Sequence, residues 1–171
     1  MSGPNSSRDA RWLMLVIAAV VILLDRWSKL AVVARVTLGQ HIPVIPNVFW
    51  ISHVQNIGAA FSMFETARSP MMVRNLLVTF SVIAVLVVVA VLWRVGRTVS
   101  ITSIALALIM GGAIGNLYDR IRLAYVVDFL EVHIGTYHWP DFNIADSAIV
   151  IGACLLLIEM LRPQHADKVH G

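Results

Sequence analysis

Four carboxylic acids follow one another in a short stretch of this apolar chain. The stretch, YVVDFLEVHIGTYHWPDFNIAD (125–146), contains Asp128, Glu131, Asp141 and Asp146. Two carboxyl groups held close together do not both ionise easily, so one keeps its proton while the other can accept one. Such a pair can hydrolyse a peptide bond, because the carboxylate takes a proton from water and the carboxylic acid protonates the carbonyl oxygen or the leaving nitrogen. Spacing alone does not select the two acids.

Other hydrolytic chemistries find no support in the sequence. The six histidines are scattered without an H-E-x-x-H pattern, and His133 and His138 lie five residues apart in a predicted loop. No G-x-S-x-G sequence is present, and Ser28 and Lys29 are neighbours that would not face each other on a helix. We therefore expect neither a metal ion nor a cofactor.

The composition is that of a membrane protein. The 171 residues have a mean hydropathy of +0.80, and only 13% of them are charged, whereas about 25% are charged in an ordinary soluble domain. A soluble domain of this length would need a charged surface that this composition cannot supply. We expect one integral-membrane domain over residues 1–171.

Four segments are expected to cross the membrane as helices, at about 12–32, 72–93, 99–118 and 142–161. The middle two contain long uncharged runs, close to the ~20 residues that a hydrocarbon core requires. The first could be read as a cleaved signal peptide, but charged residues interrupt the approach to any cleavage site, so we expect it to be retained. The fourth can cross only if it includes Asp146, and a carboxylate within the membrane indicates a function.

The positions of lysine and arginine predict the orientation. These residues are denser in the short segments that would share a side with the two termini, which favours cytoplasmic termini. The connections of about 33–71 and 119–141 then lie on the outer side. Polar residues converge on that face: Asp25, Asn116, Asp119, Asp128, Asn143 and Asp146. For Asp119 alone, pairing with Arg120 at the interface would explain its position equally well.

The first outer connection predicts a small antiparallel sheet. It contains three patches rich in β-favouring residues, at 44–45, 48–52 and 60–64, separated by Pro, Asn and Gly. In the third predicted helix, Gly111 and Gly115 are four residues apart, a spacing that lets another helix approach closely. The expected fold class is an all-α membrane protein with four transmembrane helices and a small outer sheet.

Five short motifs, taken together, resemble the lipoprotein signal peptidases, also called signal peptidase II. They occur in the family's order over nearly the whole chain: DRWSK (25–29), NIGAAF (56–61), GGAIGNLYDR (111–120), VVDF (126–129) and FNIAD (142–146). Two positions depart from the family pattern, because Arg26 replaces the usual Gln and Ile57 replaces the usual Thr. Neither departure falls on the predicted catalytic residues.

The resemblance implies a role for each matching residue. The catalytic pair would be Asp128 and Asp146. Residues that line the site and position the substrate would be Asn56, Asn116, Arg120 and Asn143. Residues that support the site would be Asp25, Asp119, Gly58 and Ala145. Glu131 and Asp141 have no matching motif, and we expect them to be solvated loop acids.

The resemblance also implies a fold and a setting. The family has four helices, a periplasmic β-cradle, and a periplasmic loop or short helix between helices three and four. It implies a multi-pass protein of the bacterial inner membrane, with the active site near the periplasmic face. The partners would be diacylglyceryl-modified prolipoproteins and membrane lipid, with no nucleic acid. The enzyme would act as a monomer, without a cofactor, and would be inhibited by globomycin-type cyclic peptides.

Two other functions compete with this interpretation. Intramembrane acids also mark the pathways of proton- or ion-coupled transporters, but those sites lie near the midplane and often accompany repeated halves, which this sequence lacks. A noncatalytic helical scaffold would explain Gly111 and Gly115 but would leave Asp146 unexplained.

Overall fold

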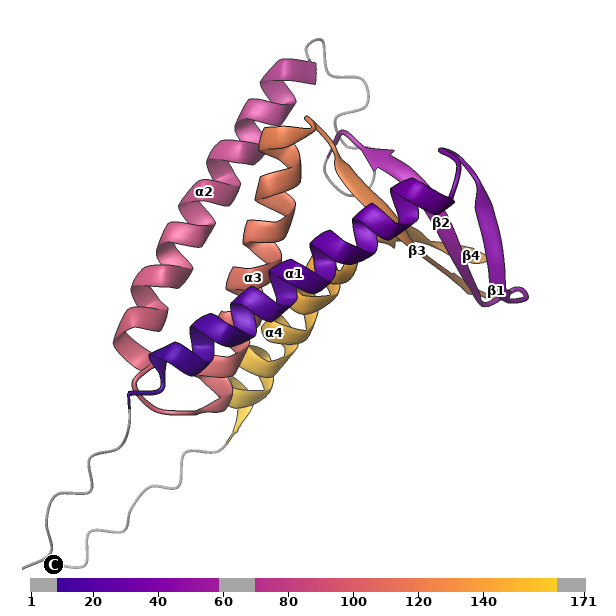
Figure 1. Ribbon diagram of the computed structural model, residues 1–171. Coiled ribbons are helices and arrows are strands. Elements are labelled where there is room, and N and C mark those ends of the chain that lie inside the picture. The colour runs from indigo at the N-terminus through magenta and orange to yellow at the C-terminus, as the bar shows by residue number, and fades with distance from the viewer. Residues whose placement is uncertain (1–8, 59–69, 163–171) are drawn as a thin grey trace, which may run out of the picture.

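The computed structural model describes residues 9–58 and 70–162, which form four helices and one four-stranded sheet. The helices are α1 (Arg11–Arg35), α2 (Pro70–Val95), α3 (Ile101–Arg122) and α4 (Ile144–Leu161). The strands are β1 (His41–Ile45), β2 (Phe49–Asn56), β3 (Val126–Ile134) and β4 (Tyr137–Phe142). The sheet lies at one end of the helices, where α1 ends and α4 begins, and the first residues of α1 and the last of α4 lie at the opposite end (Figure 1).

All four predicted helices are present, each within a few residues of its expected bounds. Within residues 9–58 and 70–162, three helical segments are long and apolar enough to cross a membrane: Met71–Val95, Ile101–Arg122 and Ile144–Leu161. Helix α1 is not among them, and it carries Asp25, Arg26 and Lys29 in its second half. Large apolar side chains such as Phe80 and Leu86 are exposed on α2, as expected for a helix that faces lipid.

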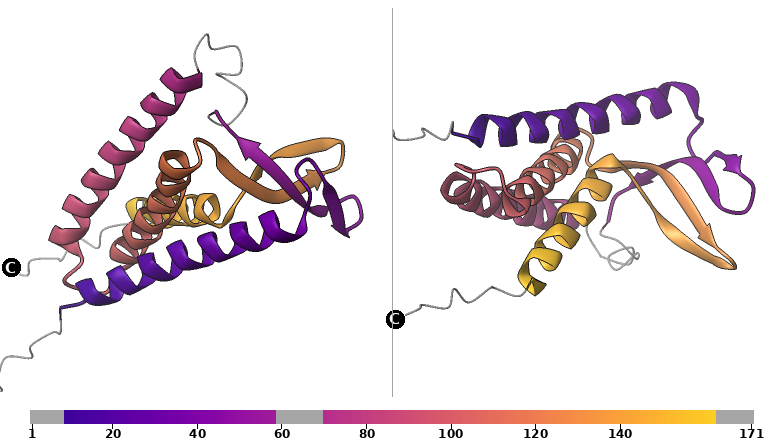
Figure 2. Two further views of the ribbon diagram at one scale, coloured as in Figure 1. Left: turned by 45° about the horizontal axis from the view of Figure 1, so that its top comes forward. Right: turned by 90° about the horizontal axis from the view of Figure 1, so that it is seen from below.

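Helix α3 is the centre of the bundle and packs against each of the other three helices (Figure 2). Glycines let these helices approach closely. A Cβ atom on Gly111 would lie 2.8 Å from the carbonyl oxygen of Ala18 in α1, and one on Gly115 would lie 2.8 Å from Oδ2 of Asp25. The close approach predicted from the spacing of the two glycines is therefore confirmed, and it brings α1 and α3 together at Asp25.

The sheet is antiparallel, with strand order β1-β2-β3-β4. Strands β1 and β2 confirm two of the three predicted patches, and the third, 60–64, lies outside the described residues. The segment between α3 and α4 is where the prediction was wrong: instead of a loop or short helix it forms β3 and β4. Strand β3 pairs with β2 from Asn56↔Val126 to Phe49↔Val132, so its stability depends on a partner far away in the sequence.

The sheet is fastened to the helices by a small apolar cluster. Val32 and Val36, at the end of α1, pack with Phe129 of β3, and all three side chains are buried. Arg74 joins α2 to the last turn of α3, the helix that precedes β3, since its Nε donates a hydrogen bond to the carbonyl oxygen of Arg120 at 3.0 Å. Strand β3, which carries Asp128, is therefore held against the helix ends.

Candidate active site

Asp128 lies in β3 and is almost completely buried. Its two oxygens accept hydrogen bonds from side-chain amides: Oδ2 from Nδ2 of Asn56 at 3.0 Å and Oδ1 from Nδ2 of Asn143 at 2.7 Å. Burial raises the pKa of Asp128 from its ordinary value of 3.8 to about 7, and repulsion from Asp146 acts in the same direction against the two amide hydrogen bonds. The side chain can therefore keep a proton near neutral pH.

Asp146 lies in the first turn of α4 and is half-buried. It forms a capping box with Asn143: its Oδ2 accepts from the backbone N–H of Asn143 at 3.2 Å, and its own N–H donates to Oδ1 of Asn143 at 3.0 Å. Its Oδ1 accepts from Nδ2 of Asn116 at 2.7 Å. The start of a helix favours negative charge, so this position suits a carboxylate.

Asn143 joins the two acids. It is fully buried and is the N-cap of α4. Its side-chain Nδ2 donates to the carboxyl group of Asp128, and its backbone N–H donates to that of Asp146. One residue thus links the carboxyl group of an acid on a strand to that of an acid on a helix.

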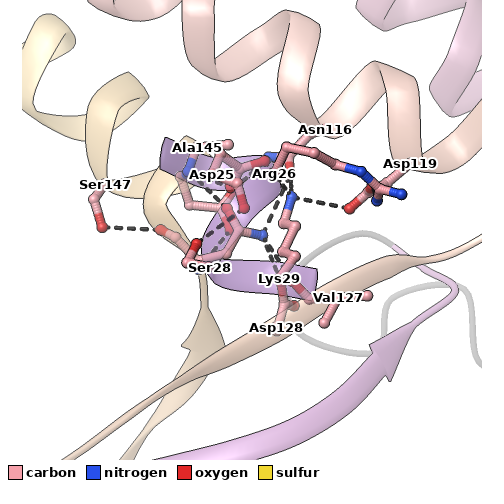
Figure 3. A network of polar contacts seen from close by, with 12 residues as sticks. Asp25, Arg26, Ser28, Lys29, Asn116, Asp119, Val127, Asp128, Ala145 and Ser147 are labelled. Atoms are coloured by element: carbon pink, nitrogen blue, oxygen red, sulfur yellow. Dashed lines mark hydrogen bonds and ion pairs between the residues drawn. The ribbon is translucent and has the colours of Figure 1, made fainter. Parts of the chain in front are cut away.

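Beside the acids, Lys29 of α1 is completely buried in a charged cluster (Figure 3). Its Nζ lies 2.7 Å from Oδ2 of Asp25 and 2.9 Å from Oδ2 of Asp119. The sequence contained a signal for this cluster, because Asp25 and Lys29 are four residues apart on one face of an otherwise apolar helix. Lys29 is not among the predicted site residues.

Lys29 also fixes the orientation of Asn116. Its Nζ donates to Oδ1 of Asn116 at 3.1 Å. Because an ammonium group can only donate hydrogen bonds, Asn116 must turn its oxygen toward Lys29. The NH₂ group of Asn116 is then left to donate to Asp146. The buried lysine therefore acts on Asp146 through Asn116.

The residues predicted to support the site make backbone contacts that position it. The N–H of Ala145 donates to Oδ1 of Asp25 at 2.9 Å, which ties the start of α4 to α1. The N–H of Gly58 donates to Oδ1 of Asn56 at 3.1 Å, which leaves Nδ2 of Asn56 to face Asp128. These contacts act on the orientation of the two acids.

Arg120 lies near the two acids but, unlike Asn116 and Asn143, is not fixed by side-chain hydrogen bonds within the described part of the chain. It is half-buried and interacts electrostatically with Asp146, Asp128 and Asp119. Within residues 9–58 and 70–162, its guanidinium makes no hydrogen bond. The unusual Arg26 has a partner, since its Nη1 lies 3.6 Å from Oδ1 of Asp119. Ile57, the other departure from the family pattern, is exposed.

Glu131 and Asp141 are not the solvated loop acids that we expected. Glu131 is buried in β3; burial favours a higher pKa, but hydrogen bonds with His41 and His133 outweigh it and hold the pKa of the carboxyl below its ordinary value. Asp141 is half-buried in β4 and accepts from Oγ of Ser52 at 3.0 Å, while burial raises its pKa. The prediction was wrong because pairing of β3 with β4 folds both acids onto the sheet.

The fold and this buried polar site define an integral-membrane enzyme. Two solved structures described as bacterial membrane enzymes are similar to this chain. One has a TM-score of 0.80 and 27% identity and covers 93% of each chain. The other has a TM-score of 0.78 and 28% identity and covers 89% of this chain and 94% of its own.

Sequence comparison identifies the family. The family model described as signal peptidase (SPase) II matches residues 17–162, and the chain belongs to this family of peptidases. A lipoprotein signal peptidase of Alteromonas mediterranea is 44% identical over 94% of this chain and 86% of its own length. One from Solibacter usitatus is 41% identical, covering 91% and 94% of the two chains, and one from Pseudomonas putida is 41% identical over 99% of both.

Proposed function

We propose that this protein is an aspartic endopeptidase that removes signal peptides from diacylglyceryl-modified prolipoproteins. It cleaves on the amino side of the lipidated cysteine, with Asp128 and Asp146 as the catalytic pair. The observation that carries this proposal is the bridge through Asn143, whose side-chain amide donates to Asp128 and whose backbone N–H donates to the carboxyl group of Asp146. Membership of the signal peptidase II family supports the substrate class.

In the proposed reaction, the two acids begin with one proton between them. Asp128 holds that proton and donates it as a hydrogen bond to the carbonyl oxygen of the scissile peptide. The carboxylate of Asp146 takes a proton from a water molecule, whose oxygen attacks the carbonyl carbon. Proton transfer from the pair to the peptide nitrogen breaks the C–N bond and releases a carboxylic acid and a free amine. The reaction consumes one water and needs no cofactor.

The place of the site fits a substrate anchored by lipid. Asp146 lies where α4 begins, and Asp128 lies on the strand that packs against the end of α1. We assign this end of the bundle to the periplasmic face of the bacterial inner membrane, with both termini in the cytoplasm. A diacylglyceryl anchor would hold the scissile bond at that depth while water reaches it from the sheet side. A monomer suffices for the reaction, and globomycin-type cyclic peptides are expected to compete for the site.

Replacement of either acid tests the assignment. Asp128→Asn and Asp146→Asn should each abolish cleavage of a lipidated precursor by the purified protein in detergent, because Asn can neither donate the acid proton nor accept one from water. Asp141→Asn is the matched control, since this aspartate contacts Ser52 and neither catalytic acid. Full cleavage by the Asp128 or Asp146 variant, with the control also active, would refute the proposed pair.

A further inference from the structure

A second group of titratable side chains lies on the sheet, away from the proposed catalytic pair. We call it the sheet histidine cluster, and it consists of His41, Glu131, His133 and His138. The residues come from three strands, β1, β3 and β4. His133 and His138 are directly paired across the β3–β4 hairpin, with ring centroids 5.0 Å apart. The turn of this hairpin is tight because Gly135 has a positive φ of 63°.

Glu131 is the centre of the cluster. Its Oε1 lies 2.7 Å from Nε2 of His133 and 3.4 Å from Nε2 of His138. Its Oε2 lies 2.5 Å from Nδ1 of His41. The Glu131 side chain is 7% exposed, whereas those of His133 and His138 are 30% and 46% exposed. A small ion can thus enter past the histidines and meet a buried carboxylate.

The donor atoms match a transition-metal site. One ligand atom from each of Glu131, His133 and His138 can be chosen so that all three lie within 4.8 Å of one another. Ligands about 2.0–2.2 Å from a tetrahedral Zn²⁺ lie roughly 3.3–3.5 Å apart, so small side-chain rotations complete the geometry. Two imidazoles and one carboxylate form a set that suits Zn²⁺ and similar divalent ions rather than Mg²⁺ or Ca²⁺.

Charge favours a cation as well. Asp141 interacts electrostatically with Glu131, His41 and His138. The sheet histidine cluster thus has two acids, Glu131 within it and Asp141 beside it. His41 is hydrogen-bonded to Oε2 of Glu131, the oxygen that faces away from His133 and His138. Carboxylates that bind a metal ion are often oriented by such a hydrogen bond. The expectation of no metal ion depended on placing His133 and His138 in a loop, where a spacing of five residues does not bring two ligands together. Across a hairpin, the same spacing makes them neighbours.

We propose that Glu131, His133 and His138 bind one divalent transition-metal ion, with Zn²⁺ as the reference ion and water in the fourth position. His41 is a positioning residue that orients Glu131. The ion links β3 to β4 and stiffens the strand that carries Asp128. It takes no part in peptide hydrolysis, because Asp128 is three residues before Glu131 on the same strand and so points to the other face of the sheet.

Zinc titration of the full-length protein tests this site. The protein is purified without a polyhistidine tag, treated with chelator, and titrated with ZnCl₂ by calorimetry in detergent. We expect one Zn²⁺ per chain and an increase in the thermal unfolding midpoint when it binds. His138→Ala removes one of the three proposed ligands at a partly exposed position, so it should weaken binding by more than the roughly 10- to 100-fold that the loss of a ligand's hydrogen-bond partner costs.

The control concerns the C-terminal histidines. His165→Ala/His170→Ala alters two histidines outside the described residues and should leave zinc affinity unchanged. Saturable binding that survives in His133→Ala/His138→Ala but is lost in the C-terminal variant would overturn the proposal, as would the absence of saturable binding. A circular dichroism spectrum like that of the parent protein establishes that each variant is folded.

Discussion

At the scale of single residues, Asn143 has two structural roles that one substitution can separate. It caps α4 and it donates a hydrogen bond to Asp128. Asn143→Ser should keep the cap, because serine is a good N-cap residue, but its shorter side chain should not reach Asp128. We expect cleavage of the lipidated precursor to fall about 10- to 100-fold, the effect of leaving a buried oxygen of Asp128 without its hydrogen-bond donor.

Thermal unfolding of the same variants distinguishes capping from catalysis. Asn143→Ala removes both contacts and should unfold at a lower temperature than Asn143→Ser, because a lost cap costs about 1 kcal/mol. Both variants should cleave the lipidated precursor more slowly than the parent protein. An Asn143→Ser enzyme as fast as the parent protein would show that the bridge between the acids is not needed.

The pKa of Asp128 predicts the pH dependence of cleavage. The proposed mechanism needs this carboxyl protonated, and burial raises its pKa to about 7. The protonated fraction therefore falls as the pH rises through that value, and kcat/KM should decrease with it, approaching tenfold per pH unit. A profile of kcat/KM measured in detergent that stays flat to about pH 9 would contradict the assigned role of Asp128.

Much of the site at this scale could be predicted from the sequence, because its acids and amides stand in recognisable motifs. All the predicted residues lie near the acids in the structure, although their roles stay predictions. Lys29 was in one of the motifs, yet its role could not be predicted. That role depends on Asp119 and Asn116, which lie on another helix.

At the scale of elements, the Asp25–Lys29–Asp119 cluster holds α1 against α3. Lys29→Met should destabilise the protein by about 3–5 kcal/mol, because two buried carboxylates lose their cation. Asp25 and Asp119 are each no more than 2% exposed, so water cannot compensate. The measurement is thermal or denaturant unfolding in detergent.

Arg26→Gln is the matched control for this prediction. Arg26 pairs with the same Asp119, but at 3.6 Å and with its side chain 34% exposed, so its loss should cost less than about 1 kcal/mol. If the lysine and arginine variants unfold alike, the buried cluster does not hold the two helices together.

The elements themselves were predictable to different degrees. The helices follow from long apolar runs, and their bounds came close to the observed ones. Strands β3 and β4 were not predicted. Strand β3 (VVDFLEVHI) is rich in β-favouring Val, Phe and Ile, but β4 contains Pro140, a residue that disfavours an interior strand. Strand β3 also pairs with β2, which precedes it by two helices in the chain, so the place of the β3–β4 hairpin in the outer sheet could not be predicted from its local sequence.

At the scale of the whole molecule, the orientation in the membrane is a prediction that cysteine labelling can check. Cys154, exposed on α4, is first replaced by serine. A cysteine at Thr136, in the β3–β4 turn, should react with an impermeant maleimide added to spheroplasts. A cysteine at Arg97, between α2 and α3, should react only after the membrane is permeabilised.

This labelling also tests whether α1 crosses the membrane. Helix α1 is less apolar than the other three helices because of the charged residues in its second half. Two of those residues, Asp25 and Lys29, form an ion pair inside the protein, so they need not prevent α1 from crossing the membrane. A cysteine at Asp9 should therefore behave like the one at Arg97. Labelling of Asp9→Cys from outside, with Arg97→Cys protected, would mean that α1 does not span.

The most direct test of the proposed activity is a digest of one prolipoprotein precursor prepared with and without its diacylglyceryl group. Mass spectrometry identifies the products. The proposed function predicts that the purified protein cleaves only the lipidated form and that the mature fragment begins at the modified cysteine. Equal cleavage of the unlipidated precursor, or a cut at another bond, would contradict it.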